Sequence, residues 1–248
     1  SEYTFRSLNS ILVSLNLAKK YFPQIEFDIV IVDHNSKKSD LDQMQKQLNK
    51  SHLKNSFVSL DLNEFRNKIN KINAENKEVT ENQISNMSNI HKSLLIAKNQ
   101  CNDLIYFVED DYLHEKDAII EMIFAYERIS SQLTKELILC PTDYPYLYTK
   151  IEPTNIFLGS NKHWRKIDES LCTFLTSKIL LEKYWDKFVS MCQFEHYPFE
   201  QPLHNIYKSE YCLSPIPSLA LHCTNINSIY GLSPIINWKK IWEENENY

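Results

Sequence analysis

Glycine is almost missing from this sequence: Gly159 and Gly231 are the only two among 248 residues. Glycine-rich phosphate-binding loops are therefore excluded. Neither the GxGxxG pattern of dinucleotide-binding folds nor the GxxxxGK[ST] pattern of P-loops can be written with so few glycines. If the protein binds a phosphate group, we expect a metal ion or side chains to hold it.

Basic blocks and long apolar runs are also missing. The formal net charge is −5 and the pI is about 5.9, so the chain lacks the electrostatic footprint of a nucleic-acid-binding protein. No apolar run approaches the roughly 20 residues that cross a bilayer, and the first residues lack the form of a signal peptide. We therefore expect no nucleic-acid partner, no transmembrane segment, and a cytoplasmic protein or one peripheral to a membrane.

Paired cysteine motifs are absent as well. The chain has six cysteines, but no two are spaced as CxxC, and several lie inside apolar runs. Buried, reduced thiols of a cytosolic protein explain this pattern better than a disulfide framework does. A zinc hydrolase is disfavoured too, because neither HExxH nor paired Cys and His spacing occurs.

The residues that are present predict a single α/β domain over 1–248. Hydrophobic residues make up 43% of the chain and aromatic residues 12%, which argues against disorder. Apolar residues at helical spacing alternate with short apolar runs up to about residue 140. The expected elements are a helix ending near Phe22, a strand at 27–33, a helix at 39–50, a strand at 57–60, a helix at 84–98, a strand at 104–108, a helix at 118–129 and a strand at 137–139. Such alternation predicts a layered fold with a mainly parallel central sheet flanked by helices.

The remaining segments have a different character. Residues 62–82 are rich in Asn, Lys and Glu, and we expect a mobile insertion or a solvated helix there. Beyond residue 140 the chain contains aromatic residues and prolines, with a short strand at 156–158 and helices near 177–190 and 200–208.

Acidic residues follow the most apolar strand. Glu109, Asp110 and Asp111 come directly after the run 104–108. In open α/β sheets, ligands bind beyond the carboxyl ends of the strands. Adjacent carboxylates repel one another unless a cation is present, and Mg²⁺ or Mn²⁺ binds one or two carboxylates together with substrate phosphates. The alternative is a solvated loop preceding a helix, where acidic residues are favoured by the helix dipole.

Asp33 ends another apolar strand and is followed by His34, Asn35 and Ser36. A carboxylate at this place could accept hydrogen bonds from a ribose hydroxyl or a base N–H. It could equally form an Asx turn or cap a helix. If both strand ends face one crevice, the binding interpretation is favoured.

These two segments resemble motifs of nucleotide-sugar glycosyltransferases of the GT-A fold. Residues 30–36 (VIVDHNS) are similar to the family's VVDdgS segment, and residues 107–111 (FVEDD) are similar to its fLDxD segment, the DxD motif. The resemblance covers roughly residues 5–140 and implies a GT-A-like three-layer fold. It also implies a nucleotide-sugar-binding half at 1–140 and an acceptor-binding half at 141–248.

The resemblance implies a role for each matching residue. Asp33 would contact the nucleotide, Glu109 and Asp111 would occupy the two acidic positions of the DxD motif, and Asp110 would occupy the middle one. Asp111 is the best candidate for a direct ligand of Mn²⁺ or Mg²⁺, and His222 matches a C-terminal histidine that some members use as a further ligand. A lone histidine is more often structural.

The sequence also departs from the family pattern. Glu109 replaces an aspartate, and Asn35 stands where a small residue is usual, although asparagine tolerates the left-handed conformation that such a turn needs. The family's first strand, before the opening helix, has no counterpart. Either the chain begins inside a longer protein or the sheet lacks that strand.

Other residues could complete the site. Glu200, which precedes an apparent helix, is preferred over Glu195 as the general base that the resemblance implies. Lys92 lies near the place where the family sets a cation against the diphosphate. Trp164 and Arg165 belong to a basic and aromatic cluster, in which the tryptophan could stack on a sugar and the arginine could bind a phosphate. Each residue also has a plain structural explanation, such as a dipole-complementing acid or a solvated loop.

The predicted function is that of a metal-dependent, inverting glycosyltransferase. It would move a sugar from a nucleoside-diphosphate sugar to a hydroxyl of a glycan, lipid-linked or protein acceptor, in glycan or polysaccharide synthesis. Two alternatives stay open. One is a metal-dependent nucleotidyltransferase or hydrolase that uses the same carboxylates. The other is a noncatalytic carbohydrate-binding or scaffold domain of degenerate GT-A fold.

Overall fold

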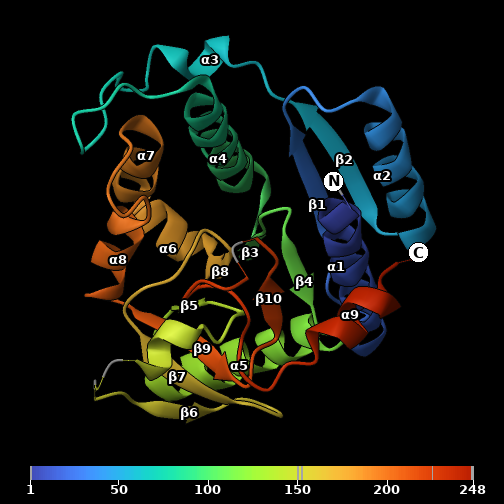
Figure 1. The fold of residues 1–248 in the computed structure, drawn as a ribbon. Coiled ribbons are helices and arrows are strands. Elements are labelled where there is room, and N and C mark those ends of the chain that lie inside the picture. Colours follow the sequence, from blue (N-terminus) through green and yellow to red (C-terminus); the bar gives the residue numbers. More distant parts are fainter. Residues whose placement is uncertain (1, 150, 152, 225, 247–248) are drawn as a thin grey trace.

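The computed structural model describes residues 2–149, 151, 153–224 and 226–246 as helices around three sheets (Figure 1). The strands are β1 (Asp28–Asp33), β2 (Lys54–Ser59), β3 (Leu104–Phe107), β4 (Tyr112–His114), β5 (Leu137–Leu139), β6 (Ile156–Leu158), β7 (His163–Ile167), β8 (Phe174–Ser177), β9 (Tyr211–Ile216) and β10 (Ala220–His222). The helices are α1 (Glu2–Tyr21), α2 (Lys38–Ser51), α3 (Asn63–Arg66), α4 (Glu81–Gln100), α5 (Ala118–Leu133), the 3₁₀ turn η1 (Pro145–Tyr148), α6 (Lys178–Lys183), α7 (Trp185–Gln193), α8 (Gln201–Tyr207) and α9 (Trp238–Glu244). None of the described helices is both long and apolar enough to pass through a membrane.

The expectation of a mainly parallel central sheet is wrong. The main sheet has the order β3-β8-β5-β9-β7-β6, and β5 with β9 is its one parallel pair within the described chain. The parallel pair β1–β2 forms a separate small sheet, and β4 with β10 forms another, antiparallel one.

Most of the expected elements are present near their expected positions, but β4, β7, β8, β9 and β10 were not expected, and three of these belong to the main sheet. Strand β8 inserts between β3 and β5 and runs antiparallel to both. All four of its residues are buried, as a central strand requires. Because β8 comes from the second half of the chain, alternation in the first half carried no information about it. Residues from both expected halves, 1–140 and 141–248, therefore share one sheet.

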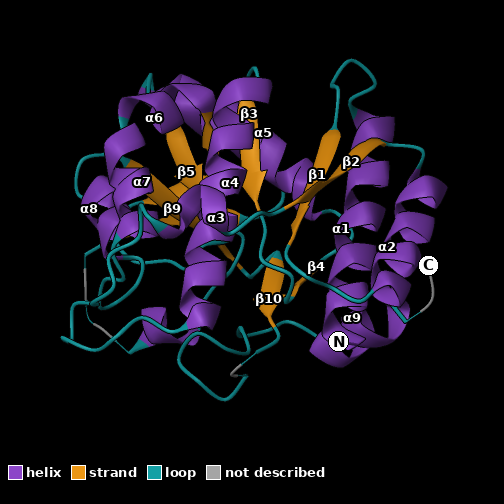
Figure 2. Ribbon diagram, turned by 90° about the horizontal axis from the view of Figure 1, so that it is seen from above, coloured by secondary structure: helices purple, strands orange, loops and turns teal. Residues whose placement is uncertain are grey.

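Helices cover both faces of the main sheet (Figure 2). The alternation of β5 shows how the core is divided: Leu137 and Leu139 pack in a cluster with α1 and α5, whereas Ile138 packs in the opposite cluster with residues of α4, α6, α7 and α8. This is the period-2 alternation of a strand buried on both sides. All six cysteines are free thiols, and four are buried, which confirms the expectation that they form no disulfide framework.

The segment 62–82 is packed against the rest of the molecule, contrary to the expectation of a mobile insertion. Phe65 in α3 is only 1% exposed and lies in a small core with Met87 of α4. The backbone N–H groups of Asn70 and Ala74 donate to the carbonyls of Gln193 and Glu195 at 2.7 and 3.0 Å. This segment therefore holds the chain just before α8.

Candidate functional site

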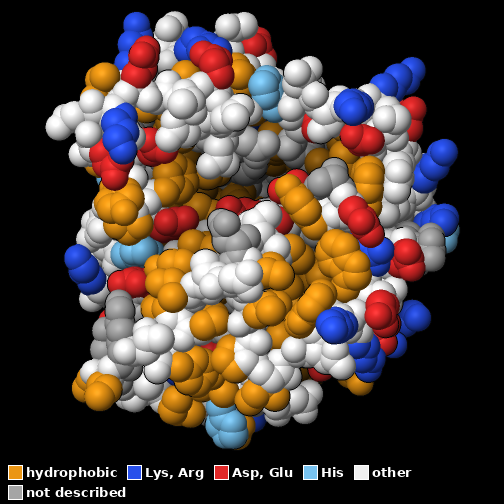
Figure 3. Space-filling view, viewed as in Figure 1, with side chains coloured by type: hydrophobic (Ala, Val, Ile, Leu, Met, Phe, Trp, Pro, Cys, Tyr) orange, Lys and Arg blue, Asp and Glu red, His pale blue; other side chains and the backbone are white. Residues whose placement is uncertain are grey.

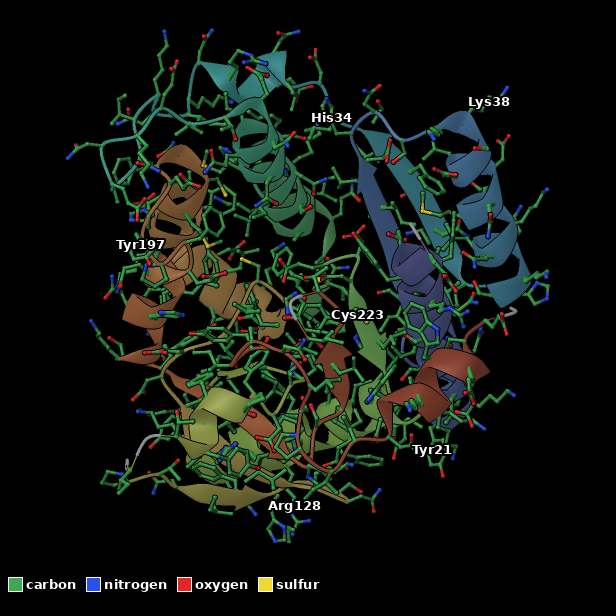
Figure 4. The ribbon with its side chains drawn as sticks, in the orientation of Figure 1. Tyr21, His34, Lys38, Arg128, Tyr197 and Cys223 are labelled. Atoms are coloured by element: carbon green, nitrogen blue, oxygen red, sulfur yellow. The ribbon has the colours of Figure 1, made fainter. Side chains whose placement is uncertain are left out.

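The acidic segment lies between β3 and β4, where it meets β10. In the β4–β10 pair His222 is opposite Tyr112, which places the histidine beside Asp111. The backbone N–H of Cys223 donates to the Asp111 carbonyl at 2.8 Å. Figure 4 labels Cys223 in the middle of the molecule, between the helices at either side. Strand pairing thus brings together residues that are more than 100 positions apart in the chain.

Asp111, His222 and Thr224 form a compact polar cluster. Oδ2 of Asp111 lies 2.9 Å from Nε2 of His222 and accepts a hydrogen bond of 2.5 Å from the Thr224 hydroxyl, which itself lies 2.8 Å from His222 Nε2. Burial alone would raise the pKa of Asp111, but its hydrogen bonds with His222 and Thr224 lower that pKa overall. Burial would lower the pKa of His222, and the Asp111 carboxylate raises it. The pair is therefore favoured in its charged form.

The second oxygen of Asp111 is left without a partner. Asp111 is 9% exposed, and its buried Oδ1 makes no hydrogen bond within the described chain. A buried oxygen of a carboxylate normally has a donor, and each exception calls for an explanation such as an unseen ion or ligand. The unpartnered Oδ1 of Asp111 is the feature of this site that a bound cation would explain.

Glu109 is held in an environment that disfavours its charge. Burial raises the pKa of Glu109 to about 8, with smaller contributions from Asp111 and Glu200. The Thr173 hydroxyl donates to its Oε2 at 3.3 Å, and its backbone N–H donates to that hydroxyl at 3.0 Å. One neutral donor does not compensate a buried carboxylate. This environment favours the protonated form of Glu109, and a cation beside it would favour the ionised form.

Glu200 and Glu109 both line a cavity of about 240 Å³. It occupies the N-cap position of α8, and burial raises its pKa. The lining combines acids, amides and apolar groups: Gln83, Asn86, Met87, Glu109, Cys172, Glu195, Phe199 and Glu200. Figure 3 shows the hollow on this face of the molecule, with acidic atoms in its floor.

Asp33 and Asp110 do not line the cavity, and neither do Asp111 and His222, which lie beside Glu109 in the chain and in the β4–β10 pair. Asp33 accepts a hydrogen bond from the Ser36 N–H at 3.3 Å, so it forms the local turn that was the alternative interpretation. Asn35 has a φ of 62°, which confirms that asparagine takes the left-handed position of this turn. Asp110 is exposed and accepts from the Thr4 hydroxyl at 3.0 Å, next to the start of α1.

Helix α4 connects the end of β1 with the cavity. Its Asn89 amide donates to the Val32 carbonyl at 2.9 Å, and its Ser85 hydroxyl lies 2.8 Å from Nδ1 of His34. Figure 4 labels His34 at this end of β1. Asn86 of the same helix lines the cavity. Helix α4 therefore contacts the end of β1 and also lines the cavity.

The two candidate phosphate-binding cations are engaged elsewhere. Lys92 pairs with Glu64 at 2.8 Å. Arg165 is buried, pairs with Asp143 and lies 4.4 Å from the centre of the Tyr148 ring. Neither cation lines the cavity. A sugar-stacking role for Trp164 is contradicted, because that side chain is fully buried and donates from Nε1 to Glu121 at 3.1 Å.

Within the described chain, no group of three or more His, Cys, Asp or Glu side chains is arranged to hold a metal ion by itself. A cation here would need ligands from a bound substrate, as Mg²⁺ usually does at phosphate sites. Sequence reasoning missed Thr173, Thr224, Gln83 and Asn86. The spacing of Thr224 two residues after His222, at a strand end, was a usable signal because alternate residues share a face; we find no comparable signal for Thr173.

Comparisons with known proteins do not identify the family. A scan against protein-family models found no match, and a search of curated protein sequences found none either.

Proposed function

We propose that this protein is a metal-dependent glycosyltransferase that uses a nucleoside-diphosphate sugar as donor. The observation that carries the proposal is the assembly of Glu109, Asp111, Glu200 and His222 from three separate parts of the chain. These are the residues that the resemblance assigns to metal binding and base catalysis. The buried Oδ1 of Asp111, which has no donor within the described chain, supports a site that awaits a ligand.

The side chains present fit a divalent cation. Asp111 would hold Mn²⁺ or Mg²⁺ through its unpartnered buried Oδ1, with Glu109 and His222 as further candidate ligands. When bound, the ion supplies positive charge against the leaving diphosphate. The chain contains almost no glycine, so a glycine-rich loop cannot bind the phosphate groups. Side chains and a carboxylate-bound cation would bind them instead.

Glu200 would act as the general base. The acceptor hydroxyl attacks the anomeric carbon as the bond to the diphosphate breaks, and Glu200 takes the hydroxyl proton. Burial raises the pKa of this carboxyl, which makes it a stronger base than an exposed glutamate. Met87 and Phe199 line the same cavity and would limit the access of water to the reacting carbon. Attack from the face opposite the leaving group inverts the anomeric centre.

The proposal also includes the acceptor of the sugar and the place where the enzyme works. The acceptor would be a glycan, a lipid-linked sugar or a protein, and the enzyme would work in the cytoplasm or at the surface of a membrane. A noncatalytic sugar-binding domain is the second candidate. It is favoured by one observation, the engagement of Lys92 and Arg165 in ion pairs away from the cavity.

Calorimetry and a transfer assay test the proposal together. We expect UDP or GDP to bind in Mn²⁺ and not in a chelator, and Asp111→Asn to weaken binding by at least about tenfold, a loss of about 1.4 kcal/mol. The neighbouring Asp110→Asn is the matched control, because Asp110 is exposed and accepts from Thr4, whereas Asp111 is buried beside His222. Glu200→Gln should retain donor binding and lose transfer. Equal binding with and without Mn²⁺, or an equal effect of the two aspartate variants, would contradict the metal role.

A further inference from the structure

Strand β6 is an edge strand of the main sheet. It pairs antiparallel with β7 on one side, and no described strand lies on its other side. The backbone N–H of Lys166 in β7 donates to the Asn155 carbonyl at 3.0 Å. Backbone groups alternate in direction along a strand, so the N–H and C=O groups of Ile156 and Leu158 point away from β7. The outer side of β6 therefore offers backbone donors and acceptors to another strand.

The side chains of β6 leave apolar surface exposed at this edge. Ile156 and Leu158 are 54% and 47% exposed, and they share one face because they are two positions apart. Phe157 points to the other face, where it packs against the core cluster of α1 and α5. At the opposite edge of the sheet, none of the four residues of β3 is exposed. Figure 1 shows β6 at the lower margin of the molecule, and Figure 3 shows hydrophobic side chains gathered at that margin.

The sequence around β6 contains no charge that would keep a second edge away. Proteins usually protect exposed edge strands against pairing with another chain, often with charged side chains. Residues 154–161 (TNIFLGSN) contain none. Arg128 of α5 reaches the end of the strand, where it donates to the Gly159 carbonyl at 3.2 Å. An identical edge that approaches β6 therefore brings no like charge against its apolar residues.

We infer that β6 pairs with β6 of a second copy of this chain, antiparallel about a two-fold axis at Phe157. This register sets Ile156 of each copy opposite Leu158 of the other. Both residues point their backbone groups outward, so each such pair exchanges two N–H···O=C hydrogen bonds. The exposed apolar side chains of the two copies then lie side by side on one face and are shielded from water. Since the axis joins the same edge of each copy, the contact closes at a dimer.

Sedimentation equilibrium of the full chain over a range of concentrations tests the inference. We expect the mass to rise with concentration from 29.4 kDa toward twice that value. Ile156→Lys combined with Leu158→Lys sets like charges opposite each other and should weaken the association by at least about tenfold. Ile156→Lys combined with Leu158→Glu sets opposite charges there and should associate more tightly than the first variant. Ile179→Lys on α6, at a position that is 61% exposed, is the matched control and should not alter the association.

Amide hydrogen exchange of the wild type is a second measurement that needs no variant. The amides of Ile156 and Leu158 should exchange more slowly as the concentration rises, because they become hydrogen-bonded between the copies. Circular dichroism and melting temperatures that match the wild type would show that a variant which no longer associates is still folded.

Three results would overturn the inference. One is a wild type that stays at 29.4 kDa up to about 1 mM, which would leave the β6 edge to an extended segment of another protein. Another is an association that the double lysine variant leaves intact, since the contact would then lie elsewhere. The third is equal weakening in both double variants, which would contradict the register. None of these measurements involves a nucleotide or a sugar, so their outcome is independent of the proposed function.

Discussion

Two buried carboxylate sites in this molecule are built in opposite ways. Glu121 on α5 is 1% exposed and receives hydrogen bonds from the backbone N–H groups of Ser160, Asn161 and Lys162 and from Nε1 of Trp164. The donors come from the loop between β6 and β7 and from β7 itself. The carboxylate is fully compensated, so it fixes this loop on the helix and leaves nothing for a ligand.

The carboxyls beyond β3 have fewer donors, and of the two only Asp111 is buried, whereas Glu109 is half-buried and lines the cavity. Glu109 receives one hydroxyl hydrogen bond, and Oδ1 of Asp111 receives none within the described chain. Burial by itself therefore does not mark a functional acid in this protein. The distinction lies in whether the fold supplies donors, because an uncompensated buried carboxyl is destabilising and persists where binding or catalysis requires it.

The largest effect should come from the compensated site. Glu121→Ala would leave three backbone N–H groups and the Trp164 indole without their acceptor. We expect it to lower the free energy of unfolding by about 3–5 kcal/mol, measured by urea denaturation. The exposed Glu127→Ala on the same helix should change the stability by less than about 0.5 kcal/mol. A loss as small as that for Glu121→Ala would contradict the structural role.

At Glu109, removing the carboxyl group should raise the free energy of unfolding, whereas removing that of Glu121 lowers it. In the folded protein the pKa of Glu109 is about 8 because of burial, compared with 4.5 ordinarily. Between these pH values the unfolded chain has released a proton that the folded chain keeps, so stability falls as the pH rises. Glu109→Gln removes this pH-dependent loss of stability. At pH 8 the variant should be more stable than the wild type by on the order of 3 kcal/mol. Near pH 5 the two proteins should have similar stability.

Urea denaturation at the two pH values measures this effect. The glycosyltransferase proposal adds that the more stable Glu109→Gln variant loses activity. A variant that is destabilised at pH 8 would show that the Glu109 carboxyl is better compensated than its contacts indicate.

Gly159 tests how tightly the compensated site is packed. A Cβ atom at this position would lie 2.2 Å from Oε1 of Glu121 and 2.5 Å from Nε1 of Trp164. Both groups are fixed by their mutual hydrogen bond, so they cannot move aside without breaking it. We expect Gly159→Ala to lower the melting temperature and cost about 2 kcal/mol. Unchanged stability would show that the loop can shift.

Thr224 should give the smallest effect. Thr224→Val keeps the shape of the side chain and removes the hydroxyl that donates to Asp111. Loss of one hydrogen bond should cost about 1 kcal/mol of stability. It should also raise the pKa of Asp111, which NMR titration of the labelled carboxyl carbon would detect. If the pKa does not change, His222 alone determines the ionisation of Asp111.

Local patterns predicted most of the helices, five of the strands and the positions of several candidate site residues. The acidic residues 109–111 were expected at a strand end because a buried apolar run stops there, and Glu200 was expected at the start of a helix. The role of Trp164 was misjudged, because a loop rich in basic and aromatic residues does not reveal whether its tryptophan points inward. Its partner, Glu121, lies 43 positions earlier, and no local pattern connects the two.

The sequence by itself indicated most of the helices and the strands β1, β2, β3, β5 and β6, since these depend on neighbouring residues and on apolar periodicity. It did not indicate β4, β7, β8, β9 or β10. Its shortage of glycine also excluded glycine-rich phosphate loops. The tertiary structure alone decided that β8 lies between β3 and β5, that β10 sets His222 beside Asp111, and that Glu121 is compensated while Glu109 is not. Strand pairing and burial depend on contacts between distant parts of the chain, and such contacts shift the pKa values of Glu109, Asp111 and Glu200.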